Sequence, residues 1–371
     1  MRGIYITPFD MAQKGYKGVA NKNEYIRKAF LNHSVLLDKL FISAGTIQKN
    51  DDTIYTFDPG AIQLKYMQLY KLYERILTQV DFSAYTFLII RYPFSTPYFL
   101  HFLKSVKKKF PSIQILIDVP TYPYELELSP VLKLVDTFFR KQLKKYVDYC
   151  ITYCEQDELF GIPCIKIQNG VNISEINVVN KRNQDHKASL TILSVANISF
   201  WHGLDRMISG LKNYYHDDSH KMPVKFIIVG DGAAVPELMK MVEKENLSSV
   251  VTFTGYLTGE ALSNIYEEGD LALGSLAAFR KNVLQDSSFK AREYCARGIP
   301  FVLTIKDVDF PETLPFVKYV ENNESPIDIQ LLVSFYESLI NYPVQSEMRA
   351  YAEQHLSWEV KVGKIIKYLN K

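Results

Sequence analysis

The chain has 371 residues, of which 47% are hydrophobic, and its formal net charge is +2. This length exceeds what one hydrophobic core usually serves, so we expect two domains. The charge is too small for a dedicated nucleic-acid binder, and the sequence holds no arginine-rich arm.

The N-terminus reaches Pro8 and Asp10 before an apolar run of signal-peptide length can develop. The longest apolar region, residues 85–103, is interrupted by Arg91 and two prolines, so it cannot supply the ~20 apolar residues of a spanning helix. We therefore expect a cytoplasmic protein, or one peripheral to the inner face of a membrane. The four cysteines lack the paired C-x-x-C spacing of a structural zinc site, which predicts reduced core thiols and no metal centre.

Short β-branched runs alternate with helical patterns along the whole chain, which is typical of parallel sheets covered by helices. The predicted fold class is α/β, with two doubly wound, Rossmann-like sheets. Predicted strands lie at 2–7, 34–43, 52–57, 86–92, 113–119 and 148–153 in the first half, and at 189–196, 224–229, 250–254, 271–275 and 300–304 in the second.

A polar segment at residues 177–187 has no hydrophobic period, as expected of a linker. We place the boundary near residue 183, which gives a first domain at 1–182 and a second at 183–350. Apolar residues recur at helical spacing in the tail, so residues 351–371 are predicted to form a helix without a strand of its own.

Open α/β sheets bind ligands at the carboxyl ends of their strands, so we expect the site in a cleft where two sets of strand ends face each other. Three segments of the second half follow predicted strands. They are residues 195–203, with Asn197 and His202; the turn with Gly230 and Gly232, which alone could be purely structural; and residues 287–298.

The third segment combines a helix N-terminus with charged side chains. Ser287 and Ser288 place amides and hydroxyls at the helix start, where a phosphate is favoured. Lys290 and Glu293 are three apart and share a helix face. This pattern suits a sugar nucleotide, with phosphate on the amides and Lys290 and ribose hydroxyls on Glu293. The alternative is a solvated Lys–Glu pair.

The same stretch, residues 289–300, resembles the signature helix of family-4 retaining glycosyltransferases, which ends in A-x-G-x-P. The resemblance implies the GT-B fold, in which two Rossmann-like domains face each other across a cleft and the final helix crosses back to the first domain. Further matches follow in order: Gln168-Asn-Gly-Val-Asn172 to the N-G-V-D turn, 201–208 to K-G-x-x-x-L-I, 226–232 to I-V-G-x-G, 253–255 to F-x-G, and Trp358 to the aromatic near the crossover.

The resemblance also assigns donor-site roles. Glu293 matches the ribose ligand, but Gln285 stands where the family has a glutamate that contacts the donor sugar, and Asp286 could substitute for it. Asn197 and His202 replace the family's Arg/Lys diphosphate clamp, with Lys290, Arg292 and Arg280 as available cations and His202 contributing if protonated. The expected catalytic residues are Gln285, Asp286 and Lys290; the expected donor-binding residues are Glu293, Arg292, Ser287, Ser288, Asn197, His202, Gly230, Gly232, Gly255, Tyr256 and Gly18.

The first domain is expected to hold the acceptor. Residues 15–22 resemble the family's glycine loop and should precede a helix starting near Asn23. The loop 118–127 offers rings and carboxylates of the kind that bind sugars, although it could be an ordinary rigid turn. The expected acceptor-binding residues are Asp118, Thr121, Tyr122, Tyr124, Arg91 and Lys22.

Two predicted helices, residues 96–110 and 130–147, carry the basic excess of the first half. The second has its lysines opposite Phe138, Leu143 and Tyr146. These are either two solvated faces or a surface that docks on anionic lipid to reach a lipid-linked acceptor.

The sequence therefore predicts a glycosyltransferase that moves a sugar from a UDP- or GDP-linked donor to a hydroxyl of a growing, lipid-linked glycan, with retention, in surface polysaccharide biosynthesis. No cofactor or metal is expected, because helix amides and cations would bear the phosphate charge. The alternatives are a sugar-nucleotide epimerase or glycan phosphorylase, and a degenerate partner protein that binds glycan. A nicotinamide oxidoreductase is disfavoured because Gly230 and Gly232 lack a third glycine at fingerprint spacing.

Overall fold

The structure is a computed structural model that describes residues 1–13, 16–58, 68–124, 128–180, 189–216, 222–282, 285 and 287–371. The chain divides into two compact units. The first comprises Met1–Gln168 and Trp358–Lys371, and the second Asn169–Ser357. Residues 181–187 of the expected linker lie outside the described residues.

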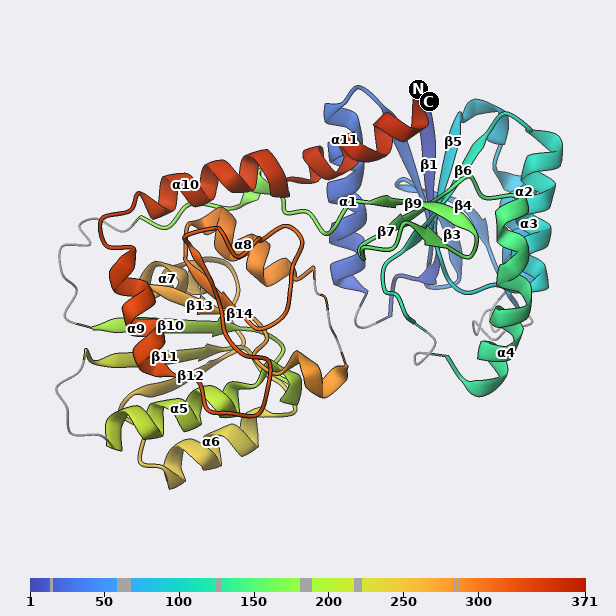
Figure 1. The fold of residues 1–371 in the computed structure, drawn as a ribbon. Helices are drawn as coiled ribbons and strands as arrows, with labels where there is room; N and C mark the ends of the chain where they lie inside the picture. Colours follow the sequence, from blue (N-terminus) through green and yellow to red (C-terminus); the bar gives the residue numbers. More distant parts are fainter. Residues whose placement is uncertain are drawn as a thin grey trace. The chain divides into compact units, whose positions relative to one another are not determined.

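The first unit is built on a nine-stranded sheet of order β4-β3-β2-β1-β5-β6-β7-β9-β8 (Figure 1). The strands from β2 to β9 in this order are parallel, and β3, β4 and β8 pair antiparallel. Their bounds are β1 (Arg2–Asp10), β2 (Leu36–Ser43), β3 (Thr46–Lys49), β4 (Asp52–Thr56), β5 (Phe87–Arg91), β6 (Gln114–Val119), β7 (Tyr149–Thr152), β8 (Glu158–Leu159) and β9 (Ile162–Lys166).

Helices cover both faces of this sheet (Figure 1). One face packs against α2 (Gln68–Gln79) and α3 (Pro97–Lys109), and the other against α1 (Lys17–Asn32) and α11 (Trp358–Leu369). A further helix, α4 (Pro130–Phe139), follows β6 and begins like α3, with a hydroxyl cap and a proline in its first turn. The continuous apolar runs of β5 and β6 are explained by burial on both faces.

The second unit contains a six-stranded, all-parallel sheet of order β12-β11-β10-β13-β14-β15. One face packs against α5 (Leu204–His216), α6 (Val235–Lys244) and α9 (Ile329–Ser338), and the other against α7 (Gly259–Glu268), α8 (Phe289–Arg297) and α10 (Val344–Tyr351). The strands are β10 (Leu190–Val195), β11 (Val224–Val229), β12 (Val251–Gly255), β13 (Leu271–Leu273), β14 (Phe301–Leu303) and β15 (Val317–Tyr319).

The predicted α/β class with two Rossmann-like sheets is confirmed. Two local expectations were wrong. The opening loop of the first unit is shorter than expected, because α1 begins at Lys17 and therefore contains Gly18 and Lys22. The strands β3, β8 and β15 were not predicted, because they are short and contain polar residues. The strand β9 was not predicted either, and it contains Pro163, which counts against a strand.

Two further sequence expectations concern the cysteines and the membrane. All four cysteines are free thiols, and three of them are buried. Among the described residues, no helix combines the length and the apolar character needed to cross a membrane.

Candidate functional site

The strand order of the second unit reverses between β10 and β13, and we call the position between the loops that follow these two strands the crevice. The loop after β10 carries a short 3-10 helix, η5 (Phe200–His202), and the loop after β13 carries another, η6 (Ala278–Lys281). The two loops are joined by a hydrogen bond of 2.9 Å from the Leu276 amide to the His202 carbonyl. In such sheets this crevice is where ligands bind.

His202 is a buried imidazole in the crevice. Its Nδ1 accepts a hydrogen bond of 3.0 Å from the Ser199 amide. Burial lowers its pKa to about 3, with the positive charges of Lys290 and Lys281 adding to the effect. The ring is therefore neutral at physiological pH and carries its proton on Nε2. It can donate a hydrogen bond to a phosphate oxygen, but it does not supply the positive charge that protonation would give.

Lys290 and Lys281 are the two lysines whose charges act on His202. Lys290 is the second residue of α8, and Lys281 ends η6 with its Nζ 3.1 Å from the centroid of the Trp201 ring. Arg280, by contrast, is held by ion pairs to Asp205 and Glu324. The crevice thus presents two lysines beside a neutral donor.

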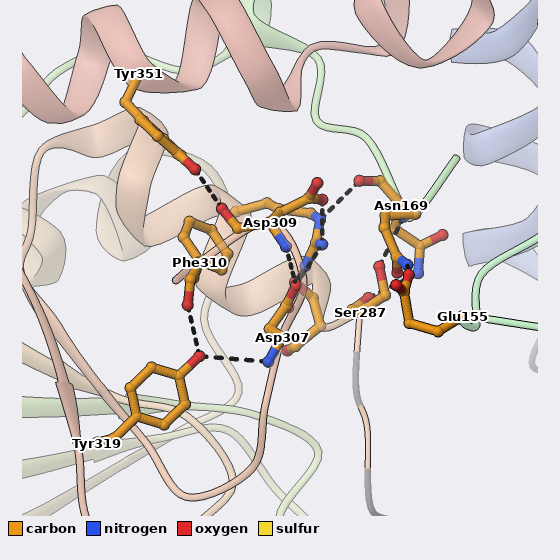
Figure 2. Close-up of polar contacts among 11 residues, drawn as sticks. Glu155, Asn169, Ser287, Asp307, Asp309, Phe310, Tyr319 and Tyr351 are labelled. Carbon is orange, nitrogen blue, oxygen red and sulfur yellow. Dashed lines mark hydrogen bonds and ion pairs between the residues drawn. The ribbon is translucent and has the colours of Figure 1, made fainter. Parts of the chain in front are cut away.

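Arg292 does not face the crevice as a phosphate ligand would. Its guanidinium is fully buried and pairs with Asp307 at 2.8 Å and also with Asp309. It further donates to the carbonyl oxygens of Asn169 and Ser288. Figure 2 shows the cluster around Asp307, Asp309 and Asn169. Burial would lower its pKa, but the two carboxylates raise it above the usual value. Arg292 is a positioning residue that fixes α8.

The turn at Gln168-Asn-Gly-Val-Asn172 also fixes the start of α8. The Asn169 amide donates to Ser287 Oγ at 2.7 Å, and Asn169 Nδ2 donates to the Ser287 carbonyl at 2.7 Å (Figure 2). Ser287 is thus engaged by this turn, whereas Ser288 is the N-cap residue of α8. The Ser288 side chain makes no capping hydrogen bond, and the amides at a helix start favour an anion.

Glu293 lies one turn into α8 and is about one-third exposed, with an ion pair of 2.8 Å to Arg297. A carboxylate has about four lone-pair sites, so the carboxylate keeps capacity for ribose hydroxyls. Gln285 is exposed, and its backbone bridges to Lys306. Asp286 lies outside the described residues.

The turn after β11 needs both of its glycines. Gly230 and Gly232 have φ of +120° and +150°, and a Cβ on them would lie 1.8 Å from the Ala196 oxygen and 2.2 Å from the Ile198 oxygen. Their role is to let this turn approach the loop after β10. The other expected donor residues, Asn197, Gly255 and Tyr256, are exposed at the ends of β10 and β12.

A polar cluster lies at the carboxyl ends of β1, β5 and β6 in the first unit. The buried Asp118 accepts a hydrogen bond from Tyr5, and Arg91 Nη1 is 3.8 Å from its Oδ2. Lys22 is buried, with its Nζ 3.6 Å from the Tyr153 ring centroid. Burial lowers the pKa of Lys22 to about 7, with Asp118 opposing the shift and Arg91 adding to it.

The loop after β6 is only partly available to an acceptor. Thr121 and Tyr122 are exposed. Tyr124 is buried, and its hydroxyl donates to Asp136 at 2.7 Å, so it belongs to an internal network. Residues 125–127 lie outside the described residues.

Residues 189–320 match the model of the family described as glycosyl transferases group 1. The chain is therefore similar to group 1 glycosyltransferases over this stretch. Comparison with curated protein sequences finds no significant match.

Solved structures resemble the whole chain at low identity. A glycosyltransferase from Rickettsia africae ESF-5 has a TM-score of 0.66 and 12% identity, covering 100% of this chain and 97% of the other. HepE from Anabaena in complex with UDP has a TM-score of 0.64 and 12% identity, and the match covers 100% of both chains. The lipopolysaccharide outer core galactosyltransferase WaaB has a TM-score of 0.62 and 13% identity, and the match covers 100% of this chain and 99% of WaaB. These likenesses establish the GT-B fold.

In the glycosyltransferase domain, the structure brings His202 and Lys290 together and adds Lys281, which the sequence analysis missed. A signal was present, because Lys281 follows a predicted strand. Asp307 and Asp309 were also missed. Nothing in their spacing of 15 and 17 residues from Arg292 marks them as its partners.

Proposed function

We propose that the chain transfers a sugar from a nucleoside-diphosphate donor to a hydroxyl of a growing glycan. The observation that carries the proposal is the crevice of the glycosyltransferase domain, where the uncapped start of α8, Lys290, Lys281 and neutral His202 gather. Helix amides, lysines and a neutral donor together suit a diphosphate. Glu293 would then accept hydrogen bonds from the ribose.

We infer that the donor is a UDP- or GDP-sugar. The GT-B neighbour HepE has been solved with UDP and with UDP-glucose, which favours UDP. The site residues bear the diphosphate charge without a metal in this proposal. Gln285 and Asp286 would contact the sugar, and transfer would proceed with retention.

The polar cluster of the first unit is the proposed acceptor site. Among the described residues, Asp118 Oδ1 and Arg91 Nη1 are buried and make no hydrogen bond. The carboxylate oxygen can accept a hydrogen bond and the guanidinium nitrogen can donate one, and a sugar hydroxyl can serve both because it donates and accepts. Thr121, Tyr122 and Lys22 would complete this site. The proposed acceptor is a lipid-linked glycan of a surface polysaccharide, which requires peripheral contact with an anionic membrane.

A degenerate partner protein is the second candidate. The observation that favours it is that Arg292 and Arg280 are engaged in internal ion pairs and His202 is neutral. This leaves the two lysines as the crevice's cations among the residues that the structure describes. A partner of this kind would bind glycan but no nucleotide, whereas an epimerase would turn over the nucleotide sugar without acceptor.

A thermal-shift screen over UDP, GDP, ADP and TDP separates these functions. A ligand at 100 times its Kd stabilises the chain by about 2.7 kcal/mol. We expect UDP or GDP to raise Tm, Glu293→Ala to reduce the shift, and Glu347→Gln, an exposed change in α10, to leave it unchanged. If no nucleotide raises Tm, the transferase proposal fails. Conversion of the nucleotide sugar in the absence of acceptor would instead support an epimerase.

A further inference from the structure

Helix α4 exposes an unusual set of large apolar side chains. Val131, Leu134 and Phe138 are 70%, 74% and 65% exposed. They are spaced three and four residues apart, so they form one stripe on the helix. The sequence analysis placed Phe138 on the face opposite the lysines. The structure turns it outward.

The way in which α4 is attached to the sheet explains why these apolar side chains are exposed. The one fully buried residue of α4 is Asp136, whose carboxylate accepts hydrogen bonds from Tyr92 at 2.7 Å, Tyr124 at 2.7 Å and the Ser95 amide at 2.6 Å. A surface helix usually packs its apolar face on the core. Here a hydrogen-bonded carboxylate anchors the helix, and the apolar stripe is left for another partner.

Exposed lysines follow this stripe along the chain. Helix α4 runs directly into the 3-10 helix η3 (Arg140–Lys145), where Lys141, Lys144 and Lys145 are exposed. A cavity of 460 Å³ lies between η3 and the last turns of α3. Its lining includes Lys104, Lys107 and Lys108 of α3, Lys144 and Lys145 of η3, and Asp148. Asp148 is the one acid in this lining, and it pairs with Lys107 at 2.8 Å.

We propose that residues 130–145, with the lysines of α3, dock the first unit on an anionic phospholipid bilayer. The stripe enters the interface between headgroups and acyl chains, while the lysines contact lipid phosphates. A second copy of the chain fits this surface less well, because a symmetric interface would bring lysines against lysines. This inference rests on the first unit alone and does not depend on the proposed transfer reaction.

Sedimentation with lipid vesicles tests the proposal on the full chain. We expect the chain to bind vesicles in which about one third of the lipid is phosphatidylglycerol and to bind pure phosphatidylcholine vesicles much less. Binding should weaken as salt is raised, because salt screens the lysines.

Two variants address the two parts of the surface, each with a matched control elsewhere on the first unit. Leu134→Ser should lower the partition coefficient at least tenfold, and Leu31→Ser, at an exposed leucine of α1, should not. The double variant Lys144→Gln/Lys145→Gln should lower it about 25-fold, since each lysine contributes about fivefold. The same exposed charge change at Lys364 and Lys367 of α11 should have little effect.

The proposal is overturned if the wild-type chain does not sediment with anionic vesicles, or if both variants bind as their controls do. It is also overturned if analytical ultracentrifugation shows a dimer that Leu134→Ser dissolves while vesicle binding stays unchanged. The Tm of every variant reports folding. A chain that binds UDP but no vesicles removes this inference and the lipid-linked acceptor, and leaves the proposed use of a nucleotide donor standing. A chain that binds vesicles but no nucleotide removes only the proposed transfer reaction.

Discussion

Lys22 and His202 show how burial sets the chemistry of single residues. His202 is neutral because burial and two neighbouring lysines disfavour its charged form. Lys22 is poised between its two protonation states near neutral pH because burial outweighs the attraction of Asp118. The sequence alone does not reveal either protonation state, because both depend on burial in the folded chain.

The stability of the first unit should depend on the protonation of Lys22. Its folded-state pKa is about 7 against an ordinary value of 10.5, so the unfolded chain binds more protons between these two pH values. Stability contributed by this residue therefore rises with pH from about 7 toward 10. We expect the free energy of unfolding of Lys22→Met, measured in urea, to gain relative to that of wild type when the pH is lowered from 9 to 6. A constant difference would contradict the assignment.

His202 should act on nucleotide binding as a neutral donor. We expect His202→Leu to weaken UDP binding about tenfold or more, since a hydrogen bond to a charged group contributes about 1.5–3 kcal/mol. Because its pKa is about 3, the ratio of wild-type to variant affinity should stay constant from pH 5.5 to 8. Calorimetric titration of both proteins measures this ratio. A ratio that grows at acid pH would mean that the imidazolium contributes.

At the scale of elements, α8 is held by interactions from two separate parts of the second unit. Arg292 of α8 pairs with Asp307 and Asp309. Asn169, in the turn at residues 168–172, donates a hydrogen bond to Ser287 at the start of the helix. These ties fix the position of the helix N-terminus within the second unit. The geometry of the proposed donor site on this helix therefore depends on buried partners.

Breaking the buried pair should destabilise the second unit. Asp307→Asn leaves the guanidinium of Arg292 undercompensated, and the expected loss is about 3–5 kcal/mol. The control Glu245→Gln removes a surface pair with Lys212 and should change little. Urea unfolding monitored by circular dichroism measures both. Equal effects would show that Arg292 does not hold the helix.

The turn after β11 offers a matched pair of glycine variants. Gly230→Ala places a Cβ 1.8 Å from the Ala196 oxygen, whereas Gly255→Ala, also at positive φ, meets nothing within 4 Å. We expect Gly255→Ala to cost about 1–2 kcal/mol from backbone strain and Gly230→Ala to cost clearly more. Thermal unfolding measures both. Equal losses would show that the turn moves freely away from the loop after β10.

At the scale of the whole molecule, the two Rossmann-like sheets could be predicted because most of their strands are buried apolar runs, such as those of β5 and β11. The strands β8 and β15 could not, because they are two and three residues long and interrupted by polar side chains. The helix of Lys290 and Glu293 was located by its motif. The ion pairs of Arg292 and the exposure of Phe138 depend on tertiary contacts, which the spacing of residues in the sequence does not reveal.

The central claim is that the crevice between β10 and β13 binds a nucleoside diphosphate through Lys290. Calorimetric titration of UDP and GDP into wild type, Lys290→Gln and the exposed control Lys240→Gln tests it most directly. We expect wild type and the control to bind one of the two nucleotides equally, and Lys290→Gln to bind at least tenfold more weakly. Binding of neither nucleotide by wild type, or equal binding by all three proteins, would contradict the claim.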